Sequence, residues 1–469
     1  MDHILRKRAY SYPKVRIVRR MLGSIMGEGM LVAEGEVHRR QKRAIQPGFS
    51  LRSIRKLTPV FHRHSHALCS YLERLAGKEH ALVDVYKVMG CTALDAIGSA
   101  AFHIEFDTLA KVESEENGQI HSMHPLPAAF ERTLSIATAN TMARNLFDAL
   151  TMIFPWLECL PIGIESFEFR QVAQVLFRVA SQLVDEAKAS VLGPDCGLYR
   201  AQPEYDRPDL LASLLRANAN HGLPESEKHS VLDKAALTDN ELTAQLSTFI
   251  FAGHETTATQ TTWLLHMLAQ HPEIQSRLRA EIRAARKKNA LCEQSECDAQ
   301  DEGRDLTMDE LDELPYLDAC IRESLRLHGA IHTTSRTAAE RDVVPCADGR
   351  RILVEKDTVI MIPLAAISQD PEWWGDDAHL FRPERWFEPM MGKTLFPGFG
   401  GVSFLLGPRG CIGRQFATVE MKAFTSILVN RLHFESDGRR TVVKRWIVSR
   451  PYDVRTHQDA CILRVRRAS

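Results

Sequence analysis

One cysteine in this chain stands in a loop that could present a single sulfur atom to a metal. The loop is Phe404-Leu405-Leu406-Gly407-Pro408-Arg409-Gly410-Cys411-Ile412-Gly413. Its glycines permit tight turns and let a flat ligand approach the backbone, and Arg409 can meet a negatively charged group on that ligand. Apolar residues at helical spacing follow the loop, so N–H groups at a helix N-terminus could stabilise a sulfur anion. A lone cysteine is usually a small core hydrophobe, but this setting predicts that Cys411 is a thiolate ligand to haem iron.

A second group of chemically capable residues interrupts the longest predicted helix, residues 238–270. The helix opens on a Thr-Asp-Asn-Glu sequence, which fits a capping box. Its apolar middle contains Ala252-Gly253-His254-Glu255-Thr256-Thr257, and a glycine there costs about 1 kcal/mol relative to alanine. We expect Gly253 to let a flat ligand approach, a threonine hydroxyl to bond the carbonyl four residues earlier, and Glu255 and Thr256 to pass protons. Taken alone, the pattern also fits a long core helix with a tolerated kink.

A third group is a glutamate and an arginine three positions apart, Glu323 and Arg326, on a predicted helix from about 315 to 327. As an exposed pair they would contribute under about 1 kcal/mol. Apolar neighbours indicate that the pair is partly buried, and a buried pair needs a further partner. Arg385, in Phe381-Arg382-Pro383-Glu384-Arg385-Trp386, is available. We therefore expect a structural Glu–Arg–Arg network that holds the cysteine loop.

The elements that must position these groups are mainly helices. Between about residues 36 and 275, apolar residues recur three and four positions apart, which is the helical period. After residue 330, β-rich runs at 351–354 and 358–362 are separated by turn signals, so we expect a small β-rich region. No internal repeat or clean linker divides the chain, and we treat it as one domain. Residues 285–306 are charged and poor in large apolar groups, which predicts a mobile insertion.

Composition excludes several classes of protein. The 59 Lys and Arg residues nearly balance the 60 Asp and Glu residues, so no global field would recruit nucleic acid. The ten cysteines are irregularly spaced, which favours a reducing environment over a disulfide framework or a zinc site. We find neither an apolar stretch long enough to span a membrane nor a secretory signal. The cationic start of the chain could contact an anionic membrane surface or form a solvated face.

At four separated places the sequence resembles the cytochrome P450 haem-thiolate monooxygenases, in particular microsomal-type members from fungi. The cysteine loop resembles their Phe-x-x-Gly-x-Arg-x-Cys-x-Gly signature at every fixed position. Residues 252–257 resemble the oxygen-activation motif, 323–326 the Glu-x-x-Arg motif, and 381–386 the Pro-Glu-Arg meander, with Trp386 where phenylalanine is commoner. The resemblance implies a P450 fold, in which haem lies between a long central helix and the cysteine loop. The implied haem-binding elements are residues 238–270, 315–336 and 381–425.

The resemblance also implies roles for single residues. The segment Gly35 to Lys42 is similar to the family's Trp-x-x-x-Arg helix, with His38 and Lys42 at the two named positions. Arg336 is similar in placement to another arginine that binds a haem propionate. Glu255 and Thr256 would be the catalytic pair. The implied cofactor-binding residues are Cys411 as the axial ligand of the iron, Arg409, Phe404, Gly407, Gly413, His38, Lys42, Arg336 and Gly253.

By resemblance the chain is an oxidoreductase that inserts one oxygen atom from O2 into a lipophilic small molecule. The implied cofactor is heme b, and the electrons come from NADPH through NADPH-cytochrome P450 reductase, with cytochrome b5 as a second candidate partner. The implied location is the cytosolic face of the endoplasmic reticulum membrane. Fungal members oxidise terpenoids and other lipophilic metabolites. Candidate pocket residues are Phe251, Ala252, Thr256, Ile331, Thr333 and Thr334, with others between 120 and 170. The two threonines would suit a mostly apolar ligand with one polar group.

The chain departs from the family at its start. In eukaryotic members the position of His38 follows a membrane anchor, a proline-rich hinge and the first β-strands, whereas 37 residues precede it here. We therefore expect that the usual anchor segment is missing and that one sheet lacks its first hairpin, which would weaken folding. Two other functions stay open. One is a haem-thiolate isomerase or dehydratase, against which the intact Glu255–Thr256 pair argues, and the other is a non-catalytic haem-binding remnant.

Overall fold

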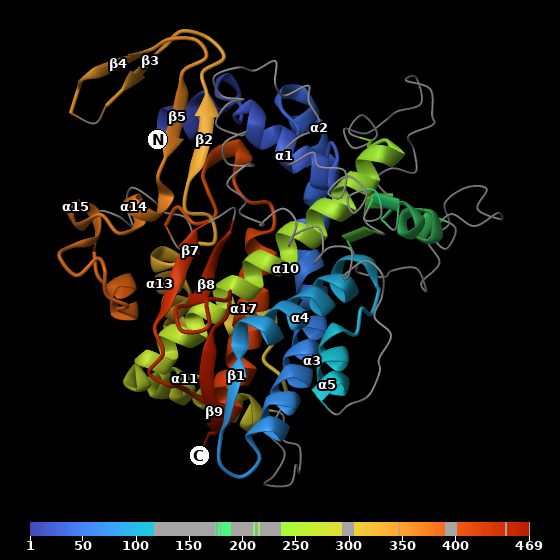
Figure 1. Ribbon diagram of the computed structural model, residues 1–469, viewed down its shortest axis with the longest axis vertical. Coiled ribbons are helices and arrows are strands. Elements are labelled where there is room, and N and C mark those ends of the chain that lie inside the picture. The colour runs from blue at the N-terminus through green and yellow to red at the C-terminus, as the bar shows by residue number, and fades with distance from the viewer. Residues whose placement is uncertain are drawn as a thin grey trace.

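A computed structural model describes residues 1–116, 236–292, 304–346, 348–389, 401–445 and 448–468, together with some helical residues between 174 and 215. Helices dominate this part of the chain, and the strands form small sheets, which confirms the predicted mainly α class (Figure 1). The expected pocket residues between 120 and 170 lie outside the described residues. No helix of the described part is long and apolar enough to cross a membrane.

The longest helix, α10 (Asp239–Gln270), runs through the middle of the molecule (Figure 1). Thr238 caps it, because its hydroxyl accepts from the Glu241 N–H while the Glu241 carboxylate accepts from the Thr238 N–H, the predicted capping box. The other α-helices whose bounds the structure describes are α1 (Arg16–Met26), α2 (Gly35–Ile45), α3 (Leu51–Ala76), α4 (Val85–Ile97), α5 (Thr108–Glu116), α11 (Pro272–Cys292), α12 (Met308–Asp312), α13 (Pro315–Leu327), α14 (Leu364–Ser368), α15 (Pro371–Trp374) and α17 (Arg414–Arg431). Short π or 3₁₀ helices are η1 (His3–Lys7), η2 (Ala9–Ser11), η3 (Gln46–Phe49), η4 (Gly98–Phe102), η10 (Pro383–Phe387) and η11 (Gly407–Arg409).

All strand pairs in the described part are antiparallel. The strands are β1 (Ala81–Asp84), β2 (Thr334–Thr337), β3 (Asp342–Pro345), β4 (Arg351–Val354), β5 (Val359–Ile362), β6 (Leu432–Ser436), β7 (Thr441–Arg445), β8 (Ser449–Asp453) and β9 (Ile462–Arg467). Three of them form a sheet in the order β1-β9-β6, while β2 pairs with β5, β3 with β4 and β7 with β8. The two β-rich runs that the sequence predicted are β4 and β5, but they belong to different sheets.

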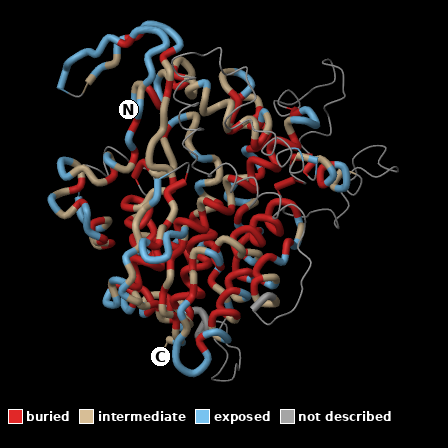
Figure 2. The backbone as a smooth tube through the Cα atoms, in the orientation of Figure 1, coloured by how far each residue is buried: buried red, intermediate tan, exposed pale blue. Residues whose placement is uncertain are grey.

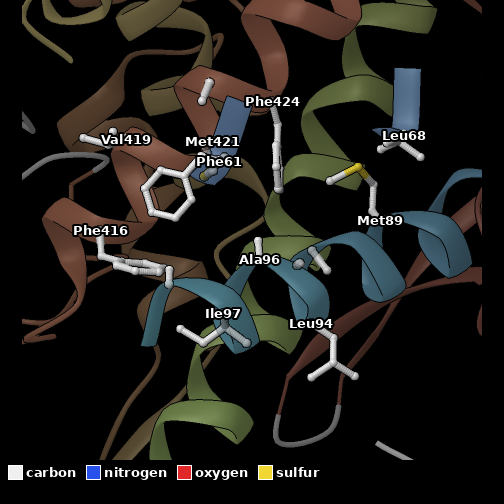
Figure 3. Packing of buried hydrophobic residues seen from close by; sticks show 14 of the residues in the cluster. Phe61, Leu68, Met89, Leu94, Ala96, Ile97, Phe416, Val419, Met421 and Phe424 are labelled. Carbon is white, nitrogen blue, oxygen red and sulfur yellow. The ribbon is translucent and has the colours of Figure 1, made fainter. Parts of the chain in front are cut away.

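The main hydrophobic core lies where α4 and α17 pack against α10 and α3 packs against both of them, and Figure 2 shows the buried residues concentrated in the middle of the molecule. Apolar side chains at helical spacing on these helices face one another, as expected for a buried helix packed on all sides. Figure 3 shows Phe61 of α3 and Phe416 of α17 beside α4, with their ring centroids 4.9 Å apart in an edge-to-face arrangement. A smaller second core joins Ile4, Leu5 and Tyr12 at the start of the chain to Trp374, Val402 and Leu406.

The structure contradicts both ends of the segment 285–306 that the sequence predicted as a mobile insertion. Helix α11 continues to Cys292, so residues 285–292 are helical. Leu306, at the other end of the segment, is buried in the main core, and Arg304 pairs with Glu310. Residues 293–303 lie outside the described residues. The basic, apolar-poor composition of 285–292 therefore belongs to the last turns of a helix rather than to a loop.

Candidate active site

Three residues in the middle of α10 are exceptions in a helix that is otherwise buried. From Leu242 to Ala269 every residue is buried except Ala252, Gly253 and Thr256, which are half-buried. Positions i, i+1 and i+4 share one helix face. Open space therefore lies beside this face, in the stretch where the sequence predicted the approach of a flat ligand.

The local geometry of α10 follows from its polar residues. The Thr256 hydroxyl donates to the Ala252 carbonyl at 2.7 Å, the backward bond that the sequence predicted. A Cβ atom at Gly253 would lie 3.0 Å from Cδ1 of Ile97, on α4. The close packing of α4 against α10 thus explains why a glycine stands at position 253 without invoking a ligand.

Cys411 lies just before the N-terminus of α17, as its sequence context predicted. Its N–H donates to the Phe404 carbonyl at 2.8 Å, and Gly413 is the N-cap of the helix. The side chain is exposed, yet desolvation by the surrounding protein raises the pKa of the thiol. An accessible thiol within dense protein faces an enclosed space. The Gly413 N–H, Arg414 and Lys42 oppose desolvation and favour the thiolate.

Three further predicted residues belong to this loop or contact it. The Lys42 ammonium donates to the Pro408 carbonyl at 2.6 Å and so ties α2 to the cysteine loop. Burial lowers the pKa of Lys42, while the nearby Cys411 opposes that shift. Phe404 is half-buried and packs against the main core. A Cβ at Gly413 would meet Phe49 and the Cys411 sulfur only at ordinary contact distance, 3.7 and 3.9 Å.

Gly407 is required by packing as well as by conformation. Its φ is +74°, a left-handed value that glycine adopts without strain. A Cβ atom there would lie 2.0 Å from the carbonyl oxygen of Leu5. The start of the chain, η1, therefore packs directly on the cysteine loop.

Buried cations gather on the other side of the loop. Arg409 is buried and forms an ion pair with Glu34, which also pairs with the Lys14 ammonium at 3.5 Å. Desolvation lowers the pKa of Lys14 to about 8 although Glu34 opposes the shift. Arg336 is buried too, and desolvation, followed by the charge of Arg409, lowers its pKa to about 10. Lys14 and Arg409 thus pair with Glu34, and Arg336 lies near enough for its charge to interact with those of Arg409 and Glu34. We call Lys14, Glu34, Arg336 and Arg409 the cationic cluster.

His38 borders the cationic cluster. Its Nδ1 lies 3.0 Å from the Tyr10 hydroxyl. Desolvation, helped by the charges of Lys14, Arg409 and Lys42, lowers the pKa of His38 to about 4. The imidazole is therefore neutral near pH 7 and can act as a hydrogen-bond donor without adding charge.

These residues fit haem, a flat apolar ring with two carboxylates and a central iron. The cationic cluster has an excess of positive charge, and the buried Nη1 of Arg409 has no hydrogen-bond partner among the described residues. Carboxylates of a ligand would supply the missing acceptors. Arg409, Arg336 and His38 are thus placed to hold propionates, and the Cys411 thiol to bind iron. Next to α10, the half-buried face of Ala252, Gly253 and Thr256 is the part of the helix that a ring could approach.

The three residues that the sequence grouped into a structural network are in contact. Both Glu323 carboxylate oxygens accept from Arg326, at 2.7 and 2.9 Å, and Arg385 Nε donates to Glu323 Oε1 at 3.0 Å. All three side chains are fully buried. Trp386, the unusual residue of the meander, donates its indole N–H to Glu323 Oε2 at 3.0 Å. The hydroxyl of Ser403 donates to the Leu325 carbonyl, which links α13 to the segment that leads into the cysteine loop.

Glu255, the predicted acid of the catalytic pair, is held by residues that the sequence did not indicate. Its Oε1 accepts from the Tyr86 hydroxyl at 2.9 Å and from Arg450 Nε at 2.8 Å. Its Oε2 lies 3.8 Å from His254 Nε2. Glu255 is buried, so these contacts replace water around its carboxylate.

The predicted pocket residues that the structure describes come from two places, the middle of α10 and the segment just before β2 and at its start. Ile331, Thr333 and Thr334 are half-buried, while Phe251 is buried in the core. The Thr334 hydroxyl oxygen accepts from Arg336 Nη1 at 2.7 Å. The hydroxyl thus has one structural partner, and its own O–H remains able to donate to a ligand.

Four residues at this site escaped the sequence analysis. Lys14 and Glu34 complete the cationic cluster, and Tyr86 and Arg450 hold Glu255. Each comes from a segment far from its partner in sequence, and none stands in a recurrent pattern.

The comparisons with known proteins agree over nearly the whole chain. A family model described as cytochrome P450 matches residues 1–452. Cytochrome P450 monooxygenase 205 of Postia placenta is 34% identical over 443 residues, 90% of this chain and 74% of that protein. Ganoderic acid synthetase of Ganoderma lucidum is 30% identical, over 93% of this chain and 78% of its own length, and cytochrome P450 monooxygenase claW of Ampulloclitocybe clavipes is 30% identical, over 96% and 79%. The sequence motifs, the helical fold and these relatives agree, and this chain belongs to the cytochrome P450 family.

Proposed function

We propose that this protein inserts one oxygen atom from O2 into a lipophilic small molecule, with electrons delivered by NADPH-cytochrome P450 reductase. The family uses heme b, O2 and NADPH-derived electrons. The observation that carries the proposal is the accessible Cys411 thiol in an enclosed space at the N-terminus of α17. A structural cysteine would instead be covered by side chains.

Bound haem would supply the activation of O2, which a thiolate ligand favours. The protein's own part is to hold the haem and to deliver protons to the site. Cys411 would hold the iron, and Arg409, Arg336 and His38 the propionates. The Thr256 hydroxyl donates a hydrogen bond to the Ala252 carbonyl, so the lone pairs of its oxygen remain available to accept a hydrogen bond from water. Glu255 and water would complete the path for protons into the site.

The first test is the carbon monoxide difference spectrum of the reduced, haem-loaded protein beside a Cys411→Ala variant. A red-shifted Soret band that the variant lacks supports the thiolate site. The same spectrum in both proteins would contradict it. Mass spectrometry with isotopically labelled O2, the reductase and NADPH then shows whether oxygen enters the product.

Labelled oxygen also separates monooxygenation from the second candidate function, isomerisation or dehydration on the same haem. The intact Glu255–Thr256 pair supports monooxygenation, because rearrangement needs no proton relay to oxygen. Product without label would favour the second candidate. A protein that shows the thiolate band but forms no product with any lipophilic substrate and functional reductase would favour a non-catalytic haem-binding role.

For the substrate class and the location we extend the proposal. One relative is named for ganoderic acid synthesis. We infer that the substrate is a lipophilic secondary metabolite, such as a terpenoid. We also infer contact with the cytosolic face of the endoplasmic reticulum membrane and, besides the reductase, cytochrome b5 as an electron donor. Binding spectra with a panel of terpenoids and fatty acids would test the substrate class, and cell fractionation would test the membrane location.

A further inference from the structure

The Glu34 carboxylate bridges two cations of the cationic cluster. Glu34 stands at the N-cap position of α2, but its side chain makes no capping hydrogen bond to that helix. Its Oε1 instead accepts from the Lys14 backbone N–H at 2.9 Å and lies 3.5 Å from the Lys14 ammonium. Its Oε2 pairs with Arg409 of the cysteine loop. The carboxylate therefore joins the segment before α1 to the cysteine loop.

Glu34 adds a lasting negative charge to an enclosed site. The side chains of Lys14 and Glu34 are 13% and 14% exposed, and that of Arg409 is 3% exposed. Desolvation raises the pKa of Glu34, but the charges of Lys14 and Arg409 and the Lys14 N–H outweigh it, so the net shift of the pKa is downward. Glu34 is thus ionised near pH 7. Charges in such a site interact more strongly than in water, because the effective dielectric constant is lower.

The charges of the cationic cluster match those of a dicarboxylate ligand. In the part of the chain that the structure describes, Glu34 is the one carboxylate that pairs with a cation of the cluster. Lys14 is protonated near pH 7, since its pKa is about 8, and His38 is neutral, since its pKa is about 4. The three cations therefore exceed the single carboxylate by two charges. The two propionates of haem carry two negative charges, so the loaded cluster is neutral, which limits the cost of burying it.

The same charge bears on the reduction of the haem. Reduction adds one electron to the site, so a nearby negative charge opposes it and a positive charge favours it. Arg409, which pairs with Glu34, stands two residues before Cys411, the expected ligand of the iron. The charge of Glu34 thus lies in the same site as the group that accepts the electron.

We propose that Glu34 is a positioning residue that holds Lys14 and Arg409 for the haem propionates, and that its negative charge lowers the reduction potential of the bound haem. The proposal rests on the haem site of the proposed function. It adds to that function a residue that sets how readily the reductase delivers the first electron. Glu34 acts through the two cations that it contacts and not on the substrate.

The test is a spectroelectrochemical titration of the haem-loaded, substrate-free Glu34→Gln variant beside the parent. Glutamine keeps an oxygen that can accept from the Lys14 N–H but loses the charge, so the ferric-to-ferrous potential should shift upward. Lys14→Met removes a positive charge from the same pair and should shift the potential downward. Glu34→Asp keeps the charge and should keep the potential of the parent. A merely structural pair would give no such opposite shifts.

Lys14 gives the upward shift a characteristic pH dependence. Loss of Glu34 removes the anion that favours the ammonium of Lys14, whose pKa desolvation already lowers to about 8. The upward shift in Glu34→Gln should therefore shrink as the pH rises and Lys14 gives up its proton. In the Lys14→Met background this compensation is gone, and Glu34→Gln should raise the potential over the whole pH range.

Glu36→Gln is the matched control, because it makes the same change two residues later, at an exposed pair with Arg39. Its potential should equal that of the parent. An unchanged potential in Glu34→Gln in both backgrounds, or shifts of the same sign in Glu34→Gln and Lys14→Met, overturns the proposal. If Glu34→Gln takes up no haem, Lys14→Met decides, and a potential that does not fall in this variant overturns the proposal. The carbon monoxide band of the parent, recorded first, tests the proposed function separately.

Discussion

Arg385 donates to Glu323 Oε1 at 3.0 Å although 62 positions separate the two residues. Arg385 also binds the Trp374 carbonyl and Asp377, and Arg326 binds the carbonyls of Ser368 and Ala378. The Glu323 carboxylate therefore joins α13 to the segment between α14 and η10. Trp374 lies in turn against Gly401, at the start of the described residues that lead to Cys411. Through Trp374 and Gly401, the network contacts the segment that leads into the cysteine loop.

Replacing Glu323 by glutamine should destabilise the protein strongly. The change leaves the buried Arg326 guanidinium without a carboxylate and Arg385 with Asp377 alone, and the loss of one partner from a buried ion pair costs about 3–5 kcal/mol. Urea unfolding followed by circular dichroism measures the loss. Glu388→Gln, which removes an exposed partner of Arg382 next to the network, should leave the midpoint unchanged. Equal effects of the two substitutions would show that the network does not stabilise the fold.

Gly407→Ala should prevent the cysteine loop from forming. The left-handed φ alone costs an alanine roughly 1–2 kcal/mol. The new Cβ would also collide with the Leu5 carbonyl, 2.0 Å away, and backbone atoms cannot rotate aside. Gly349→Ala is the matched control, because its φ is +82° and its Cβ would enter open space. We expect the thiolate carbon monoxide band to be lost only in Gly407→Ala, with the larger loss of unfolding free energy. A similar loss in both would assign the whole effect to φ.

Arg336→Leu should separate haem retention from stability. Arg336 is buried, and its hydrogen bonds go to the Thr334 hydroxyl and the Ser335 carbonyl, which are uncharged. Removal of such a cation relieves a desolvation cost in the haem-free protein but removes a partner of a propionate. We expect haem transfer to excess apomyoglobin to become faster, without a loss of stability in the haem-free protein. Arg341→Leu, at an exposed pair with Glu355, should change neither. Slower or unchanged transfer in Arg336→Leu would remove this residue from the haem site.

Local pattern explains which parts of the site could be predicted from the sequence. The capping residue of α10, the backward bond of Thr256 and the position of Cys411 before α17 depend on neighbours a few residues away. Glu323 and Arg385 are far apart in the sequence. Their contact could still be predicted, because a buried Glu323–Arg326 pair requires a third partner and Arg385 was available.

The sequence did not predict contacts between distant residues when neither residue needed a partner for local reasons. Nothing in the sequence around Glu34 indicates that it meets Arg409, because a solvated surface would use the same residue types. The pairing of β5 with β2 rather than β4 was equally hidden, since edge strands of similar composition can exchange partners. The approach of Leu5 to Gly407 joins residues about 400 positions apart, and glycine at 407 had an explanation in turn geometry alone.

Buried histidines predict that the protein loses stability in mild acid. Desolvation lowers the pKa of His38, His64 and His266 from 6.5 to about 4. Between these two values the unfolded chain binds protons that the folded protein does not, so stability falls as the pH falls from 6.5 to about 4 and is fully retained above 6.5. Each histidine contributes up to about 3 kcal/mol to this loss.

His64 tests the argument away from the haem site. Its Nε2 lies 2.9 Å from the Ser99 hydroxyl, and a glutamine at this position can keep that hydrogen bond without titrating. The free energy of urea unfolding, measured across this pH range, should fall less steeply in His64→Gln than in the parent, by up to about 3 kcal/mol over the whole interval. His80→Gln, at an exposed position, is the control and should follow the parent. If His64→Gln also follows the parent, the imidazole of His64 takes up its proton in the folded protein as readily as in the unfolded chain, and His64 does not cause the acid sensitivity.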